Sequence, residues 1–192
     1  MQITLIRHLP TNWNVKTWLQ GRQDIDILPI TVAEKHKIEN NQNQLRMLSP
    51  FELILASTLK RTHQTARLYG LEAETEELLD ELDFGKFEGQ PKNQLISELG
   101  VSWVNNPSEV VLGESIVQLE MRIIKFLQKY KESHNILVFG HGSWIRAFIS
   151  LIQYGHINQM NKISVNNNEC ITLTFDVNHI LNRILKKEDP SI

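Results

Sequence analysis

The sequence has little of what marks secreted or membrane proteins. Its 192 residues include a single cysteine, Cys170, so the chain cannot form an internal disulfide, which suits a reducing compartment. No apolar run approaches the roughly 20 residues that span a membrane. The first residues lack the basic stretch, the long apolar stretch and the small-residue cleavage site of a signal peptide. We therefore expect a cytoplasmic protein without membrane contact.

Neither sign of charge is in clear excess. The chain carries 20 Lys and Arg against 22 Asp and Glu, a formal net charge of -2. This balance excludes a general electrostatic attraction to nucleic acid or to an anionic membrane. Any anion-binding site must be built locally, from a few converging basic residues. The chain has no repeat, low-complexity tract or linker, and its length suits one domain over residues 1–192.

Short apolar runs predict the strands of a sheet. Three of them are almost continuously apolar, which favours a parallel sheet covered on both faces, and they span residues 2–7 (QITLIR), 52–57 (ELILAS) and 135–140 (NILVFG). A fourth run, residues 171–177 (ITLTFDV), alternates and indicates a further strand. Helical patterns lie between and after these strands, at residues 31–48, 58–69, 114–131 and 143–154. The order predicts a three-layer α/β/α sandwich with a mainly parallel central sheet.

Basic residues follow the three buried strands. Arg7 and His8 end the first, Ser57 and Arg61 follow the second, and His141 comes after the third. The carboxyl ends of parallel strands form one edge of a sheet, where ligands bind. Arginine matches the geometry of phosphate, and a neutral histidine can attack phosphorus. A carboxylic acid could then protonate the leaving oxygen. The pattern indicates phosphoryl-transfer chemistry.

Six segments, in order along the chain, carry a family resemblance. They are Arg7-His8-Leu9-Pro10-Thr11 with Asn14; Gln20-Gly21 with Asp24; Ser57-Thr58-Leu59-Lys60-Arg61 with Gln64-Thr65-Ala66; Leu79-Asp80-Glu81 with Phe84-Gly85 and Phe87-Glu88-Gly89; Gly113-Glu114-Ser115; and His141-Gly142 with Ile145-Arg146. Together they resemble the histidine phosphatases, the phosphoglycerate mutase-like superfamily, and specifically its phosphatase branch. The resemblance covers most of the chain and implies the phosphoglycerate mutase-like fold.

The resemblance also implies a role for each matched residue. His8 would be the nucleophile that accepts the phosphoryl group, and Glu81 the general acid. Arg7 and Arg61 would clamp the phosphate, to which His141 would donate a hydrogen bond. Four further residues would lie on the substrate side: Asn14, Gln20, Gly21 and Gly142. No metal ion and no organic cofactor are expected.

Three positions depart from the family pattern. Leu9 stands where glycine is usual, so either the backbone is ordinary there or the pocket is reshaped with some loss of activity. The spacing between Asp24 and Pro29 is longer than usual, so either Asp26 replaces Asp24 or the loop carries a small insertion. Glu34 replaces a glycine at the start of a helix, which bears on packing more than on chemistry.

The leading hypothesis is a metal-independent phosphomonoester hydrolase acting on a phosphorylated small molecule through phospho-His8. Three alternatives stay open: a phosphoglycerate mutase-type phosphotransferase, a phosphohistidine-protein phosphatase acting on a phosphoprotein, and a weakly active module that binds phosphate or a partner. A metal hydrolase is disfavoured because the interleaved arginines would repel a cation. Residues 13–30 and 90–112 are expected to contact the leaving group. Neither the substrate nor the oligomeric state follows from the sequence.

Overall fold

The computed structural model describes residues 1–185, so the end of the expected domain, residues 186–192, lies outside the described part. A five-stranded sheet forms its centre, in the order β3-β2-β4-β1-β5. Its strands are β1 (Gln2–Arg7), β2 (Leu53–Ala56), β3 (Glu74–Thr75), β4 (Asn135–Gly140) and β5 (Cys170–Thr174). All neighbours are parallel except β5, which runs antiparallel to β1.

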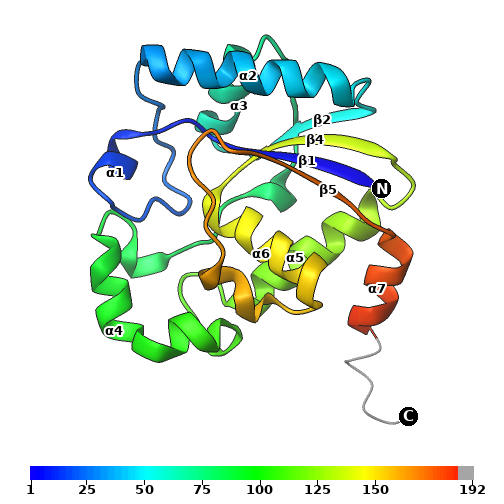
Figure 1. Ribbon diagram of the computed structural model, residues 1–192. Coiled ribbons are helices and arrows are strands. Elements are labelled where there is room, and N and C mark those ends of the chain that lie inside the picture. Colours follow the sequence, from blue (N-terminus) through cyan, green and yellow to red (C-terminus); the bar gives the residue numbers. More distant parts are fainter. Residues whose placement is uncertain (186–192) are drawn as a thin grey trace.

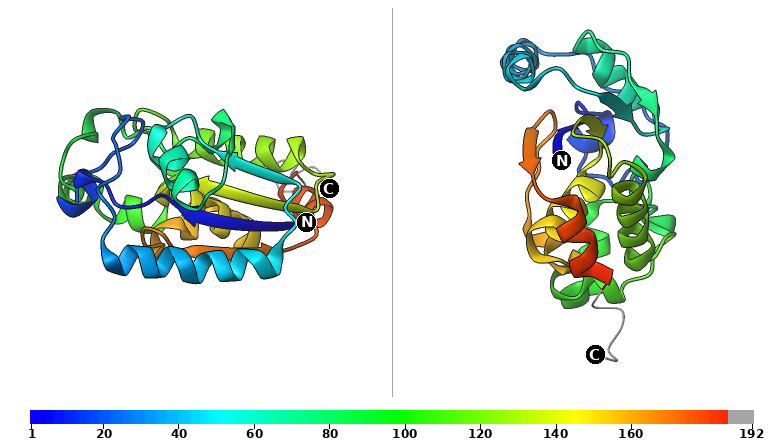
Figure 2. Two further views of the ribbon diagram at one scale, coloured as in Figure 1. Left: turned by 90° about the horizontal axis from the view of Figure 1, so that it is seen from above. Right: turned by 90° about the vertical axis from the view of Figure 1, so that its right-hand side faces the viewer.

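Helices cover both faces of this sheet and make three layers (Figures 1 and 2). On one face lie α2 (Val32–Leu48) and α3 (Lys60–Leu68); on the other lie α5 (Ile116–Lys129) and α6 (Gly142–Tyr154). Each face has its own apolar core, one around Leu9, Ile38 and Phe139 and the other around Leu5, Ile123 and Trp144. The expected α/β/α sandwich with a mainly parallel sheet is confirmed.

The central strands are buried because their sequences are apolar on both sides of the pleat. In β1 and β4 every residue after the first is buried, except the Arg7 at the end of β1. The two strands pair in parallel from Gln2 with Asn135 to Arg7 with Gly140. This register ends both strands at the same level, so the residues that follow them, His8 and His141, emerge side by side.

Side-chain caps set the starts of two of the predicted helices. Thr31 begins α2, where its hydroxyl accepts from the backbone of Glu34 and the Glu34 carboxylate accepts from the backbone of Thr31. Ser115 and Gln118 cap α5 in the same reciprocal way. Such a capping box satisfies backbone donors that the first turn leaves free. Glu34 therefore has a local function in starting α2.

Two differences from the sequence-based expectations lie after residue 90. The expected strand over residues 171–177 ends at Thr174, and Val177 instead begins α7 (Val177–Leu185). The helix α4 (Lys92–Asn105) was not predicted; Gly100 interrupts its helical pattern with φ +54°. The remaining short elements are α1 (Asn12–Val15), η1 (Glu77–Leu79), η2 (Gly85–Phe87), η3 (Pro107–Glu109) and η4 (Ile157–Lys162).

Within residues 1–185, no helix combines the length and apolar character needed to cross a membrane.

Candidate active site

Two histidines meet at the edge of the sheet where β1 and β4 end. The backbone N–H of His8 donates to the carbonyl of Gly140 at 2.9 Å, which extends the pairing of the strands by one residue. The ring centroids of His8 and His141 are 5.3 Å apart. Both rings are buried, with exposed fractions of 2% and 0%. The parallel sheet thus brings together two residues that are far apart in the sequence.

His8 is held as a neutral ring with one free nitrogen. Its Nδ1 lies 2.7 Å from the carbonyl oxygen of Leu9. A carbonyl can only accept, so Nδ1 carries the proton and Nε2 keeps its lone pair. The pKa of His8 lies well below its ordinary value of 6.5, first because of burial and then because Arg61 and Arg7 are close. The ring is therefore neutral at neutral pH and can act as a nucleophile at Nε2.

His141 is also neutral, but both of its ring nitrogens have partners. Nε of Arg61 donates to Nδ1 at 3.2 Å, so the proton of the ring sits on Nε2. Nε2 lies 2.7 Å from the hydroxyl oxygen of Ser57 and donates to it. Burial, followed by the charge of Arg61, holds the pKa of His141 well below its ordinary value. To donate to a phosphate, His141 would have to exchange its bond to Ser57.

Arg61 ties the first turn of α3 to the loop that precedes α2. Its Nη1 and Nη2 donate to the carbonyls of Gln23 and Gly21 at 2.7 and 2.8 Å. The side chain is fully buried, and burial lowers its pKa to about 10, against the opposing charge of Glu81. It remains a cation at neutral pH. Three of its five N–H groups have partners within the protein, which leaves two for a bound anion.

Arg7 has unused hydrogen-bonding capacity. Its Nη1 donates to the carbonyl of Val165 at 2.6 Å, while its buried Nε has no hydrogen-bond partner among residues 1–185. Burial lowers the pKa of Arg7, and the negative charges of Glu81 and Glu169 act against that effect. A Cβ at Gly142 would lie 3.3 Å from this guanidinium, so glycine at the start of α6 allows the close approach. An unpartnered, buried cationic donor is suited to binding an anion.

The carboxylate of Glu81 is fixed at the start of α6. Oε2 accepts from the backbone N–H of Ser143 at 3.0 Å, and Oε1 accepts from Trp144 at 3.1 Å and from Leu82 at 2.9 Å. A carboxylate at a helix N-terminus is favoured by the helix dipole. Oε2 has a single hydrogen-bond partner and therefore retains an open position that can hold a proton. Glu81 can both give and take a proton there.

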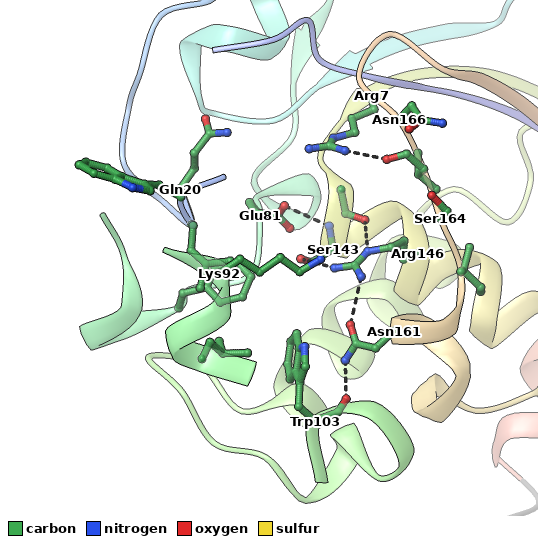
Figure 3. Close-up of a pocket in the computed structure, with 18 of the residues that line it drawn as sticks. Arg7, Gln20, Glu81, Lys92, Trp103, Ser143, Arg146, Asn161, Ser164 and Asn166 are labelled. Carbon is green, nitrogen blue, oxygen red and sulfur yellow. Dashed lines mark hydrogen bonds between the residues drawn. The ribbon is translucent and has the colours of Figure 1, made fainter. Parts of the chain in front are cut away.

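A cavity of about 450 Å³ opens at this end of the sheet (Figure 3). Its size is in the range of small-molecule sites. Five of the residues predicted for the site line it: Arg7, Gln20, Gly21, Glu81 and Gly142. Arg61, His8 and His141 do not line it but are buried beside Arg7. Gln20 is itself buried, and its Oε1 has no hydrogen-bond partner among residues 1–185.

Known proteins similar to this chain show which family it belongs to. The model of the histidine phosphatase superfamily (branch 1) matches residues 3–186. The chain belongs to the histidine phosphatase superfamily. A relative from an Enterobacter species, named "Probable phosphoglycerate mutase GpmB", is 30% identical over 165 residues, which are 79% of this chain and 74% of the relative.

Solved structures of histidine phosphatases share this fold. The alpha-ribazole phosphatase from Shigella flexneri is 25% identical, with a TM-score of 0.71 over 90% of this chain and 89% of that one. The phosphoserine phosphatase from Entamoeba histolytica is 24% identical, with a TM-score of 0.74 over 91% of this chain and 90% of that one. At this identity the similarity shows a shared fold and nothing more. The chain is therefore a phosphatase-family enzyme, with a mostly parallel sheet like those of its neighbours.

Asn14 has a structural role in this histidine phosphatase and is not among the cavity-lining residues. Its Oδ1 accepts from the backbone N–H of Thr11 at 3.0 Å, and the hydroxyl of Thr11 accepts from the backbone N–H of Asn14. The pair forms the capping box of α1. Oδ1 also lies 3.4 Å from Nδ2 of Asn167, which in turn donates to the carbonyl of His8. Asn14 thus supports the backbone of His8.

Both aspartates proposed for the family position contact α3. Asp24 accepts from the backbone N–H of Lys60 at 2.8 Å, at the first turn of the helix. Asp26 pairs with the ammonium of Lys60 at 3.0 Å and accepts from the amide of Gln64 at 2.7 Å. The hydrogen bond and charge of Lys60 lower the pKa of the exposed Asp26. Both aspartates therefore support the helix that carries Arg61.

Several residues of the cavity were not singled out from the sequence. Residues 13–30 and 90–112 do line it, through Trp18 and Leu19 and through Lys92, Leu95 and Trp103, but residues 161–166 also contribute and had no sequence signal. Arg146, which belongs to the last of the six family segments but was given no role there, lines the cavity as well. Its place in the family motif, one helical turn after Gly142, was the sequence signal that could have identified it. Among residues 1–185, no group of three or more His, Cys, Asp or Glu side chains is arranged to hold a metal ion.

Proposed function

We propose that this histidine phosphatase is a metal-independent phosphomonoester hydrolase that acts on a small molecule, with His8 as nucleophile and Glu81 as proton donor. The observation that carries the proposal is the neutral His8 ring. Its Nδ1 proton is committed to the carbonyl of Leu9 at 2.7 Å, its Nε2 keeps a lone pair, and the charges of Arg61 and Arg7 act on the ring. The guanidinium groups of Arg7 and Arg61 supply the positive charge that a phosphoryl group needs.

In the first step, Nε2 of His8 attacks phosphorus and forms a P–N bond. The P–O bond to the leaving group breaks, and the leaving oxygen takes the proton of the Glu81 carboxyl group. The products are the free alcohol, phospho-His8 and the Glu81 carboxylate. The Leu9 carbonyl, which holds Nδ1–H, stabilises the positive charge that develops on the ring during attack.

In the second step, the Glu81 carboxylate takes a proton from water as the water oxygen attacks phosphorus. The P–N bond breaks, its electron pair returns to Nε2 of His8, and inorganic phosphate leaves. Both residues return to their starting states. Splitting one displacement into two is the usual advantage of a covalent intermediate.

A small phosphorylated molecule suits the cavity better than a protein loop does. The helix α4 contributes Lys92 and Trp103 to its wall (Figure 3), and Trp18 lines the cavity as well. Phosphoryl transfer between small molecules, as in a mutase, would use the same phospho-His8. The two activities differ in the fate of the phosphoryl group, which product analysis measures directly as inorganic phosphate or as a new phosphate ester.

The test is to trap the intermediate. Wild-type protein, briefly incubated with a ³²P-labelled alkyl phosphate and quenched in alkali, should retain acid-labile label, and His8→Ala should retain none and lose turnover. His36→Ala changes an exposed histidine on α2 and serves as the matched control. Rapid turnover by the His8→Ala protein would refute the assignment of the nucleophile. Chelator should leave the activity unchanged, whereas a loss that zinc restores would contradict metal independence.

A further inference from the structure

The turn of residues 166–169 leads into β5 and lies against the carboxyl end of β1, where Figure 1 shows it in orange beside the blue strand. The backbone N–H of Asn168 donates to the carbonyl of Arg7 at 3.0 Å, and the N–H of Arg7 donates to the carbonyl of Glu169 at 3.2 Å. The turn thereby continues the pairing of β5 with β1 up to the residue before the nucleophile. The reaction described above gives no part to Asn167, whose side chain contacts the backbone of the nucleophile.

Polar side chains from α2 and from the end of α3 hold the backbone of this turn. Asn168 adopts a positive φ of 57°, which asparagine tolerates better than most residues. Its Oδ1 accepts from the hydroxyl of Tyr69, and its backbone carbonyl accepts from Nδ2 of Asn41 at 3.0 Å. Nζ of Lys37 donates to the backbone carbonyl of Asn167 at 3.1 Å. None of these bonds uses the side chain of Asn167, so the turn is held without it.

The peptide group between His8 and Leu9 is held from both of its sides. Nδ2 of Asn167 donates to the carbonyl of His8 at 2.8 Å, and the N–H of Leu9 donates to the hydroxyl oxygen of Thr65 at 3.0 Å. The Thr65 hydroxyl in turn donates to the carbonyl of Arg61 at 2.7 Å, which fixes its orientation. The carbonyl of one residue and the N–H of the next belong to one planar group and point in opposite directions. The turn therefore holds one side of this peptide group, and α3 holds the other.

The orientation of the Asn167 amide follows from its two neighbours. Nδ2 lies 2.8 Å from the carbonyl oxygen of His8 and 3.4 Å from Oδ1 of Asn14. That Oδ1 accepts from the backbone N–H of Thr11 at 3.0 Å, so it is the oxygen end of the Asn14 amide. Both neighbours of Asn167 are therefore acceptors, and only its NH₂ group can donate to them.

Fixing this peptide group also fixes the carbonyl that holds the proton of the His8 ring. That carbonyl belongs to Leu9, and it lies 2.7 Å from Nδ1 of His8. Between the held peptide group and this carbonyl, the backbone has only the two soft dihedrals of Leu9. Pro10 follows, and a residue before proline is restricted to extended conformations. If the peptide group were released, the carbonyl could turn away and the ring could carry its proton on Nε2, which would then have no lone pair for attack.

We propose that Asn167 is a positioning residue for the nucleophile. Its amide holds the His8–Leu9 peptide group, so that the Leu9 carbonyl keeps the ring proton on Nδ1 and Nε2 stays free to attack phosphorus. Asn167 is not among the described residues that line the cavity, so it acts through His8 and not on the substrate. This inference rests on the proposed role of His8 as nucleophile.

Asn167→Ala removes the amide and leaves the turn in place, because Lys37 bonds to the backbone carbonyl and Asn168 keeps its partners. It should lower kcat roughly three- to tenfold, the effect of losing one hydrogen bond between neutral groups, and change KM by less than about twofold. In a single turnover, label from a ³²P-labelled alkyl phosphate should reach His8 more slowly by the same factor. Asn178→Ala makes the same change at an exposed position of α7 and should behave as the wild type.

The tautomer of His8 is the readout that a merely structural role would not move. In protein labelled with ¹⁵N-histidine, two-bond ¹H–¹⁵N correlation spectra show which ring nitrogen carries the proton. The wild type and Asn178→Ala should give the Nδ1–H form for His8, in a signal that His8→Gln removes and so assigns. Asn167→Ala should give a mixture in which the Nε2–H form appears. Asn167→Ser also loses the amide; it is measured if denaturant melts show that the alanine variant is unfolded, and it should give the same mixture.

A pure Nδ1–H spectrum for His8 in the folded Asn167 variant would overturn the inference, and so would a kcat equal to that of the wild type. Failure of the proposed function is a separate result. If the wild type forms no phospho-His8 and hydrolyses no phosphate ester, the assignment of the nucleophile fails. The spectra then still decide whether Asn167 controls the ring: a mixture in the variant supports that control, and an unchanged Nδ1–H form refutes it.

Discussion

The carbonyl oxygen of Leu9 accepts the Nδ1 proton of His8 at 2.7 Å, while the Leu9 side chain is 1% exposed in the core beneath α2 and α3. The backbone of Leu9 is not in the left-handed region, since Thr17 and Asn168 are the non-glycine residues with positive φ among those described. The leucine in place of the family glycine therefore leaves the site intact. Its backbone carbonyl fixes the Nδ1 proton of His8, and its side chain packs in the apolar core.

Replacing Leu9 should affect folding and not chemistry. Leu9→Ala removes a buried side chain and should lower the free energy of unfolding by about 2–5 kcal/mol, because Ile6 and Ile38 lose a packing partner. Leu9→Gly should cost more, since glycine also gains freedom in the unfolded chain. Denaturant melts measure the loss, and kcat measured below the melting range should stay within about twofold of wild type, since no catalytic contact changes. A large gain in kcat for Leu9→Gly would mean that leucine restrains catalysis after all.

The sequence predicted the parts of this site that strand order determines. Continuous apolar runs located β1, β2 and β4, and the rule for parallel sheets brought Arg7, His8 and His141 to one edge. The β1–β4 register confirms that meeting, because Arg7 pairs with Gly140. What the sequence could not supply were orientations. Whether Leu9 faces the core or the cavity, and which acceptors Arg61 and His141 choose, depend on loops whose conformation has no periodic signal.

The residues that line the cavity could not be predicted from sequence patterns either. Lys92 and Trp103 reach it from α4, whose helical pattern Gly100 interrupts, and Asn161 reaches it from the short helix η4 after α6. Their places depend on tertiary contacts, such as the hydrogen bond from Asn161 to the carbonyl of Trp103 at 2.7 Å. Similarly, Asn14 matched a family position but caps α1, a function that its spacing to Thr11 already permitted.

If Glu81 protonates the leaving oxygen, its importance should depend on the leaving group. Glu81→Gln should slow the hydrolysis of an alkyl phosphate by roughly 10²–10⁴-fold. With p-nitrophenyl phosphate the nitrophenolate leaves without a proton, so the first step should survive and the second, which needs the base, should stall. Rapid-mixing experiments should then show a burst of about one equivalent of nitrophenolate. Equal slowing of the first step for both substrates would argue against a proton donor at Glu81.

Arg122 is a positioning residue for Glu81. It donates to the carbonyls of Leu78 and Asp80 at 2.9 and 3.0 Å, and its Nε pairs with Oε1 of Glu114 at 2.6 Å. These bonds fix the segment from which the Glu81 side chain reaches α6. Arg122→Lys keeps the positive charge but removes the planar guanidinium that makes several hydrogen bonds at once. It should lower kcat roughly ten- to a hundred-fold with little change in KM.

A double-mutant cycle with Glu81 tests whether Arg122 acts by positioning the Glu81 carboxyl group. Arg122→Lys should have no further effect on kcat in a Glu81→Gln background, because there is no longer a carboxyl group to position. Arg67→Lys makes the same change on an exposed part of α3 and serves as the control. Multiplicative losses in the double variant would show that Arg122 affects the reaction by another route.

The two buried histidines should make the protein sensitive to mild acid. The pKa values of His8 and His141 are both held well below 6.5 in the folded state, chiefly by burial. In the unfolded chain they titrate near the ordinary value, so below about pH 6.5 the unfolded state binds more protons and stability falls. Above that pH the two histidines are neutral in both the folded and the unfolded state, so they no longer make stability depend on pH. As the pH falls, each histidine should lower the free energy of unfolding by up to about 1.4 kcal/mol per pH unit, until the pH reaches the pKa of that histidine in the folded state.

Denaturant midpoints between pH 7.5 and 5 test this expectation. His8→Gln should make the fall in stability on the acid side of the profile less steep than in the wild type, because one of the two buried histidines no longer takes up a proton on unfolding. Titration of His8 should not lower kcat/KM between pH 7.5 and pH 6.5, since a histidine with a lowered pKa remains neutral and nucleophilic there. A kcat/KM that falls around pH 6.5 together with an unchanged stability slope in His8→Gln would show that His8 titrates as an ordinary, exposed histidine, and the neutral-nucleophile mechanism would have to be abandoned.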